Sequence, residues 1–286
     1  MEALKHILPL LLTASLAGLV LTVGLQARPG DLIYVLRRPK LLAKAVLAVV
    51  VVPPVVAAAL VWFLPLDPVV KAGIMLMAMS PVPPLVPGQE LGLGARKEYA
   101  YGVYVAMALL TFVTVPLAFD LAAKLFGHDR TIPFSLIGKT LLTGVLAPLA
   151  VGLAINRLAP KFAAGAAPWI YKLSLLLVVL VFLPIIASVW PPIERLFGNG
   201  TILAMIVLTA ITLIGGHQLG GPDPVDRGTL AIASSVRHPG IAMLIANTAF
   251  TDKRITAAVL LFLLVSMVVG TLYKVWFKRR LKLAAA

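Results

Sequence analysis

Apolar runs of roughly 20 residues follow one another along almost the whole chain. A helix of that length crosses the ~30 Å hydrocarbon core of a bilayer. The composition agrees, because 60% of the 286 residues are hydrophobic and only 13% are charged, whereas soluble domains carry about 25% charged residues. The sequence therefore excludes a soluble globular protein. It predicts an all-α polytopic membrane protein that forms a single domain over residues 1–286.

Apolar stretches that are bounded by charged residues, proline or glycine predict nine transmembrane helices. The first is interpreted as a retained span, because basic residues follow it and no small-residue cleavage motif is present. The predicted spans cover residues 6–26, 41–63, 69–94, 99–120, 133–156, 168–190, 201–217, 227–248 and 255–277.

Positive charge gathers at the ends of the spans. The formal net charge of +14 would suggest a nucleic-acid partner in a soluble domain, but basic residues at span ends set orientation and meet lipid headgroups. Nine spans place the termini on opposite sides, and a basic tail marks the C-terminus as cytoplasmic: Lys278, Arg279, Arg280 and Lys282. We expect a multi-pass protein of the cell inner (plasma) membrane with its N-terminus outside, the lipid bilayer as a partner and no nucleic-acid partner.

Two of the nine spans cannot be continuous helices. The third contains the sequence SPVPPLVPG over residues 80–88, whose four prolines remove amide donors and clash with preceding carbonyls. The eighth contains Arg237-His238-Pro239-Gly240 near its middle. Broken helices at bilayer depth occur only where they line a cavity or are buried in protein, so we expect these segments to face each other or water. Pro53-Pro54 and Pro184 are interpreted as simple kinks.

The two breaks occupy matching positions in two sets of four spans. Spans one to four and six to nine run in opposite orientations, with span five as the connector, and each set has its break in its third member. Inverted repeats with matching broken helices are the pattern of a secondary transporter.

The sequence around both breaks resembles the bile acid:sodium symporter family. Residues 229–242, TLAIASSVRHPGIA, are similar to that family's TLSIE-x-x-x-QNSGLA segment. Ser80-Pro81, followed by Ala95-Arg96-Lys97-Glu98, resembles its CPGG-x-x-SN segment with an ARGD-like end. The resemblance implies a panel domain and a core domain in which spans three and eight cross. Spans four, five, seven or nine would surround the crossing, and spans one, two and six would contribute to the panel.

This chain departs from the family at the positions that the resemblance assigns to sodium binding. Ala233 stands where the family has a ligating glutamate, Arg237 where it has a glutamine, and His238 where it has an asparagine. Gly88 and Gln89 replace a Ser-Asn pair, and Gly102 and Ala106 replace two hydroxyl residues. These changes remove oxygen ligands and negative charge and add a positive charge. We therefore predict that no sodium ion binds and that no other metal or cofactor is required.

Arg237 needs compensation, because an isolated guanidinium inside the bilayer costs several kcal/mol. Glu90 is the carboxylate that we expect nearest to it, about 9 Å deeper than Arg96 along a helix. Three interpretations stay open. In the first, Arg237 replaces the sodium ion as a tethered cation, neutralised by Glu90 and by carbonyls freed at the breaks. In the second, it binds an anionic substrate, assisted by the helix N-termini after Pro84 and Pro239. In the third, it forms a structural ion pair only.

Other polar residues near the breaks complete the predicted substrate-binding set. Its members are Arg237, His238, Glu90, Gln89, Ser234, Ser235, Pro84, Pro239 and Gly240. His238 is interpreted mainly as a hydrogen-bonding pocket residue and Glu90 as a candidate proton carrier. The two serines are candidates for substrate contacts, although serines in membrane helices also bond to their own backbone.

These features predict a secondary transporter of small organic anions or amphipathic acids that works by alternating access without sodium. A proton-coupled carrier that uses Glu90 or His238 is one alternative, and a sensor or scaffold that has lost transport is another. An arsenite carrier is disfavoured because the chain has no cysteine. An enzyme is not expected, because no catalytic constellation such as HExxH appears within the spans.

Overall fold

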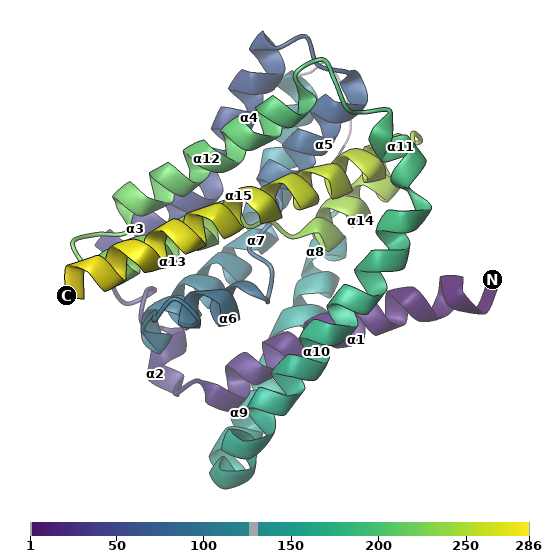
Figure 1. The fold of residues 1–286 in the computed structure, drawn as a ribbon. Helices are drawn as coiled ribbons and strands as arrows, with labels where there is room; N and C mark the ends of the chain where they lie inside the picture. Colours follow the sequence, from purple (N-terminus) through teal and green to yellow (C-terminus); the bar gives the residue numbers. More distant parts are fainter. Residues whose placement is uncertain (1, 126–130, 286) are drawn as a thin grey trace.

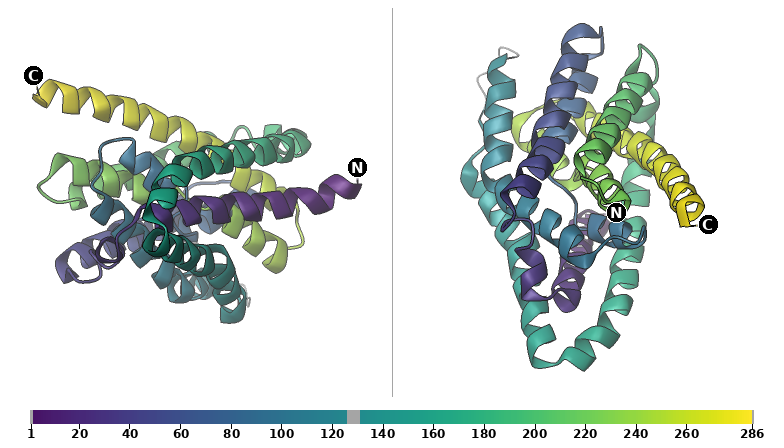
Figure 2. Two further views of the ribbon diagram at one scale, coloured as in Figure 1. Left: turned by 90° about the horizontal axis from the view of Figure 1, so that it is seen from below. Right: turned by 90° about the vertical axis from the view of Figure 1, so that its left-hand side faces the viewer.

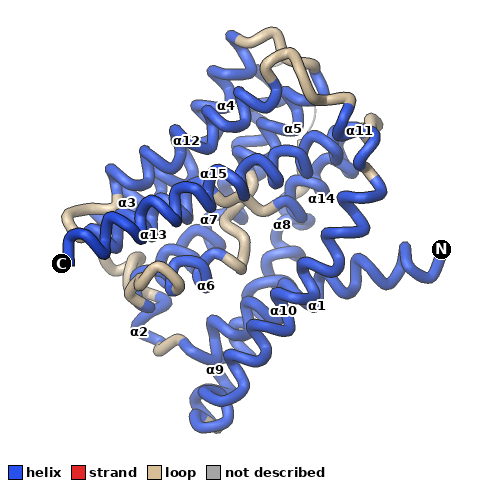
Figure 3. The backbone as a smooth tube through the Cα atoms, viewed as in Figure 1, coloured by secondary structure: helices blue, strands red, loops and turns tan. Residues whose placement is uncertain are grey.

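The computed structural model describes residues 2–125 and 131–285, and every regular element in them is a helix. The first half contains α1 (Glu2–Gln26), α2 (Pro29–Leu32), α3 (Pro39–Val46), α4 (Val52–Phe63), α5 (Pro68–Met79), α6 (Val86–Leu91), α7 (Lys97–Leu125) and α8 (Phe134–Leu141). The second half contains α9 (Ala147–Leu158), α10 (Pro160–Ser188), α11 (Trp190–Glu194), α12 (Thr201–Leu219), α13 (Pro224–Ser235), α14 (Pro239–Ala249) and α15 (Arg254–Ala285). Figure 3 shows helices joined by short loops.

Seven helical segments within the described residues are long and apolar enough to cross a membrane. They are 39–63, 97–125, 134–158, 160–188, 201–219, 224–249 and 254–283. Two further apolar helices are shorter, Leu10–Gln26 and Pro68–Met79. The shortness of Pro68–Met79 follows from the proline run, which ends the helix after 12 residues. The chain is thus an all-helical multi-pass membrane protein.

Two spans contain a π-helical turn instead of a simple kink. The turn η1 (Leu47–Val51) joins α3 to α4, and η2 (Leu142–Leu146) joins α8 to α9. Pro53 and Pro148 follow these turns within a few residues, and a proline disturbs the regular hydrogen bonds of the preceding helical turn. The interpretation of Pro53-Pro54 as a simple kink is therefore incomplete, because a π-helical turn precedes it.

The helices form two groups, which Figure 1 shows one below the other. The three-helix layer contains α1, α9 and α10, which contact one another. The larger bundle contains α3 to α7 and α12 to α15, in which α12 packs on α13 and α5 packs on α15. The two views in Figure 2 show α15 extending beyond the bundle towards the C-terminus.

Two spans belong to different groups from those that the family resemblance implied. Span two, α3 to α4, contacts α5, α12 and α13, so it lies in the larger bundle and not with α1 and α10. In span five, α8 contacts α7, whereas α9 packs on α1 and α10. The packing of α9 on α1 is explained by glycine, because Gly24 of α1 and Gly152 of α9 lie in close contact. A Cβ atom on Gly152 would lie 2.4 Å from the Leu21 carbonyl oxygen. Small residues permit this backbone approach in membrane helices.

Candidate functional site

The site lies where the two interrupted helices meet. The helix α5 ends at Met79 and α13 ends at Ser235, so both predicted interruptions are confirmed. The backbone N–H of His238 donates hydrogen bonds to the Pro81 carbonyl oxygen at 3.0 Å and to Ser80 Oγ at 3.2 Å. The two interruptions therefore contact each other directly.

The Arg237 side chain is at the centre of this contact and is only 3% exposed. Its Nη1 atom donates to the Val49 carbonyl oxygen at 2.9 Å and to the Ser80 carbonyl oxygen at 3.2 Å. Its Nη2 atom donates to the Ser234 carbonyl oxygen. One guanidinium thus joins η1, the break after α5 and the break after α13.

All three carbonyl groups lack their usual helical partner. In a helix, the carbonyl of residue i accepts from the N–H of residue i+4. That residue is Pro53 for Val49 and Pro84 for Ser80, and proline has no N–H. For Ser234 it is His238, whose N–H bonds to the other break. Because unpaired carbonyls are costly in a buried site, the guanidinium stabilises an arrangement that the prolines create.

The expected ion pair between Arg237 and Glu90 is absent from the described part of the chain. Glu90 lies in α6 and is 1% exposed, which agrees with its expected interior position. However, neither of its carboxylate oxygens has a hydrogen-bond partner. The terminal nitrogens of Arg237 bond to backbone carbonyls. The expected compensation by carbonyls freed at the breaks is therefore present, whereas the expected compensation by Glu90 is not.

His238 and its neighbours begin α14. His238 Nδ1 accepts a hydrogen bond from the Ile241 N–H at 3.3 Å, which caps the helix. Pro239 is the first residue of that helix, where its fixed backbone angle is favourable. Gly240 lies against the His238 ring, since a Cβ atom there would be 3.0 Å from Cε1.

The remaining predicted polar residues make other contacts. Gln89 Oε1 accepts from Lys274 Nζ of α15 at 3.2 Å. Ser234 Oγ donates to the Thr212 and Ala231 carbonyls at 2.6 and 2.9 Å, and Ser235 Oγ donates to the Ile232 carbonyl at 3.3 Å. Both serine hydroxyls are therefore engaged with backbone, one of them joining α13 to α12.

Three features of the site were not predicted from the sequence. Val49 and Ser80 supply carbonyls to Arg237, and the prolines four residues later were the available signal. Tyr171 of α10 lies against Gly88, where a Cβ atom would be 2.4 Å from the tyrosine hydroxyl oxygen. This contact joins the three-helix layer to the break in the larger bundle, and no pattern in the sequence indicates it.

An ion pair lies at the end of the bundle where α13 begins. Arg96, between α6 and α7, bonds to the Asp226 carboxylate of α13 through Nη2 and, at 3.4 Å, through Nε. These hydrogen bonds raise the pKa of Arg96. The Tyr34 ring lies 5.9 Å from the Arg96 guanidinium carbon. The ion pair therefore connects the loop after α6 to the first turn of α13.

The described side chains offer no metal site of the usual kind. They contain no group of three or more histidine, cysteine, aspartate or glutamate residues that could hold a metal ion. The three oxygen atoms that converge on Arg237 are backbone carbonyls, and its guanidinium already bonds to them.

Comparisons with known proteins place these features in context. Residues 13–190 match the model of the Sodium Bile acid symporter family. The chain is also 24% identical over 281 residues to proteins of Oryza sativa subsp. indica and subsp. japonica, each named probable sodium/metabolite cotransporter BASS5, chloroplastic. Each match covers 93% of this chain and 69% of the relative.

Proposed function

Because the chain belongs to the sodium bile acid symporter family, we propose that it is a secondary transporter of small organic anions or amphipathic acids that works by alternating access without sodium. The relatives are named cotransporters, which supports a transporter in preference to an enzyme. The proposal places it in the cell inner (plasma) membrane, with its N-terminus outside and its C-terminus in the cytoplasm.

The proposal includes nine spans in two inverted repeats. The seven long helices become nine when α1 and the pair α5 and α6 are counted as spans. Spans one to four and six to nine then form the repeats, with α5–α6 and α13–α14 as the crossing pair. The larger bundle corresponds to a core domain and the three-helix layer to a panel domain. Inverted repeats with broken helices at matching positions support alternating access.

The observation that carries the proposal is the set of bonds from Arg237 to the Val49, Ser80 and Ser234 carbonyls. Carbonyls of unwound helices coordinate sodium in secondary transporters, and here a guanidinium bonds to such carbonyls. A sodium ion ~4 Å from it would be repelled by ~4 kcal/mol at an effective dielectric constant of ~20. That repulsion is large enough to suppress sodium binding by several hundredfold or more.

The same bonds favour the interpretation of Arg237 as a tethered cation over its interpretation as a residue that binds substrate. Both terminal nitrogens of Arg237 are engaged with backbone, and the side chain is buried. We propose that substrate binds beside the breaks, between the core and panel domains. Gly88 meets Tyr171 there. The proposed substrate-binding set near the breaks is Gln89, Glu90, His238, Ser234, Ser235, Pro84, Pro239 and Gly240.

A screen of organic acids tests the proposed function. Purified protein is tested for acids that raise its melting temperature, and those acids are then offered to proteoliposomes as radiolabelled substrates. We expect stabilising acids to enter the vesicles and to exchange with unlabelled acid inside. Binding without flux would contradict a transporter and support the sensor or scaffold alternative.

Glu90 favours proton coupling as a second candidate function. Burying an unpaired carboxylate costs far more free energy than burying the neutral acid, so Glu90 in its observed surroundings is suited to carry a proton. His238 is less suited, because its Nδ1 atom caps α14 as an acceptor.

Proton coupling predicts a specific effect of Glu90→Gln. We expect an inward proton gradient to stimulate uptake by the unaltered protein and to lose that effect in the variant, because glutamine cannot carry the proton. Initial rates are measured with and without the gradient. Glu98→Gln is the control, since Glu98 is partly exposed and lies near Arg96. Equal stimulation of both variants would exclude Glu90 as the proton carrier.

A further inference from the structure

A cavity extends along α5 from the end of the bundle where the loop 64–67 joins α4 to α5. Its volume is about 380 Å³, within the range of pockets that bind small molecules. The lining comes from α4, α5, α7, the loop after α14 and the start of α15. Residues from helices that are distant in the sequence therefore enclose it.

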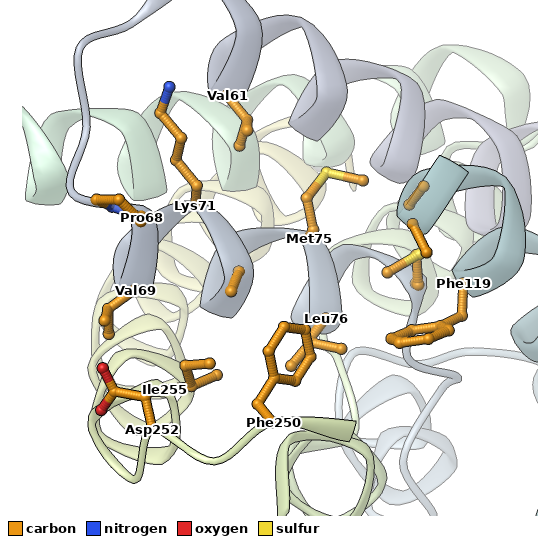
Figure 4. Close-up of a pocket in the computed structure, with 14 residues that line it drawn as sticks. Val61, Pro68, Val69, Lys71, Met75, Leu76, Phe119, Phe250, Asp252 and Ile255 are labelled. Atoms are coloured by element: carbon orange, nitrogen blue, oxygen red, sulfur yellow. The ribbon is translucent and has the colours of Figure 1, made fainter. Parts of the chain in front are cut away.

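The cavity has one charged end and a mostly apolar body. In Figure 4, Lys71 lies at the upper left and Asp252 at the lower left, and Phe119 lies on the right. Met75, Leu76 and Phe250 lie between them and surround the open space. Lys71 and the lining residue Met79 are eight residues apart on α5, so the cavity extends about 12 Å along that helix.

The charges at this end favour an anion. Within the residues that the structure describes, Asp252 is paired with Arg254, whose Nη2 atom lies 2.7 Å from its Oδ2 atom. The hydrogen bonds from Arg254 lower the pKa of Asp252, so its negative charge persists and Arg254 balances it. No described carboxylate lies within 4.0 Å of the Lys71 ammonium group. The nearby Asp67 caps α5 by accepting from the Val69 N–H, so a ligand would meet an ammonium group that has no ion-pair partner in the described part of the chain.

We propose that this cavity is a binding site for a single-chain amphipathic carboxylate, with the carboxylate at Lys71 and the apolar body between Met75, Leu76 and Phe250. A charge-assisted hydrogen bond to an ammonium group orients the head. The buried apolar lining supplies most of the binding free energy, at about 25 cal/mol for each Å² removed from water. Arg237 does not line this cavity, and the proposal does not depend on the proposed transport mechanism.

Decanoate is a suitable probe, because it has one carboxylate and one unbranched chain. Binding of radiolabelled decanoate is measured on the purified, delipidated full-length protein. We expect Lys71→Gln to weaken binding about tenfold, the usual effect of losing one charge-assisted hydrogen bond. Lys124→Gln is the matched control, because Lys124 is an exposed residue near the end of α7 and does not line the cavity.

A second variant locates the ligand independently of Lys71. The chain has no cysteine, so Ala122→Cys introduces a single thiol into the cavity wall. We expect decanoate, but not decanol, to slow modification of this thiol by N-ethylmaleimide. Normal binding of decanoate by Lys71→Gln would overturn the proposal, as would displacement of decanoate by a phospholipid at equal concentration. In the thiol experiment, the proposal would be overturned if decanoate gave no protection or if decanol protected Ala122→Cys equally.

Discussion

Arg237→Ala is expected to abolish uptake and to lower the free energy of unfolding by roughly 3 kcal/mol, about 1 kcal/mol for each carbonyl that loses its donor. The variant leaves the Val49, Ser80 and Ser234 carbonyls buried without partners. It also removes the bonds that hold two interrupted helices and η1 together. Uptake is measured in proteoliposomes at matched protein content, and stability is measured by denaturant unfolding in detergent.

Two further variants make the result specific. Arg237→Lys should keep part of the uptake, because lysine retains the positive charge. The uptake should still be lower than in the unaltered protein, because lysine has one terminal nitrogen where arginine has two that bond to the three carbonyls. Arg157→Ala removes an exposed arginine at the end of α9 and should change neither quantity. Normal uptake by Arg237→Ala would show that the guanidinium has no functional role.

Gly152→Ala is expected to destabilise the three-helix layer by roughly 3 kcal/mol, the upper end of the usual cost of overpacking. The new Cβ atom would lie 2.4 Å from the Leu21 carbonyl oxygen and 3.0 Å from Gly24 Cα. Both are backbone atoms, so α1 and α9 must separate to accommodate it. A lower melting temperature and a smaller monodisperse fraction in size-exclusion chromatography would report this effect.

Gly144→Ala provides a matched control in the same predicted span. A Cβ atom at Gly144 would meet nothing within 4 Å, and alanine favours helix over glycine. We expect this variant to be as stable as the unaltered protein or slightly more stable. Equal destabilisation by the two variants would mean that the contact between α1 and α9 does not determine the packing.

Hydropathy predicted the helical class and the position of most spans, because the bilayer imposes a length and a composition on each helix. The prolines around residues 81–84 and Pro239 predicted where two spans break. Which helices pack together was harder to predict from the sequence. Packing in a bilayer depends on close contacts between small residues, and the pairing of Gly24 with Gly152 leaves no signal in hydropathy. The turn η1 was equally hidden, since its residues form part of a continuous apolar run.

The candidate site was predicted in part. A guanidinium inside a span requires compensation, and that argument correctly singled out Arg237 as a residue with buried partners. Carbonyls freed at the breaks were among the expected partners and do bond to Arg237, but the expected pairing with Glu90 does not form. Pro53 and Pro84 identify two of the three carbonyls by simple counting along the helix. The contact between Gly88 and Tyr171 joins residues distant in sequence, and only the fold brings them together.

The most direct measurement of the central claim is uptake of a transported acid by proteoliposomes in sodium and in potassium buffers of equal ionic strength. If a fixed guanidinium has replaced the coupling ion, the two initial rates should agree within experimental error, and an imposed sodium gradient should leave accumulation unchanged. Stimulation by sodium of about tenfold or more, equivalent to ~1.4 kcal/mol, would show that a sodium ion still binds beside Arg237.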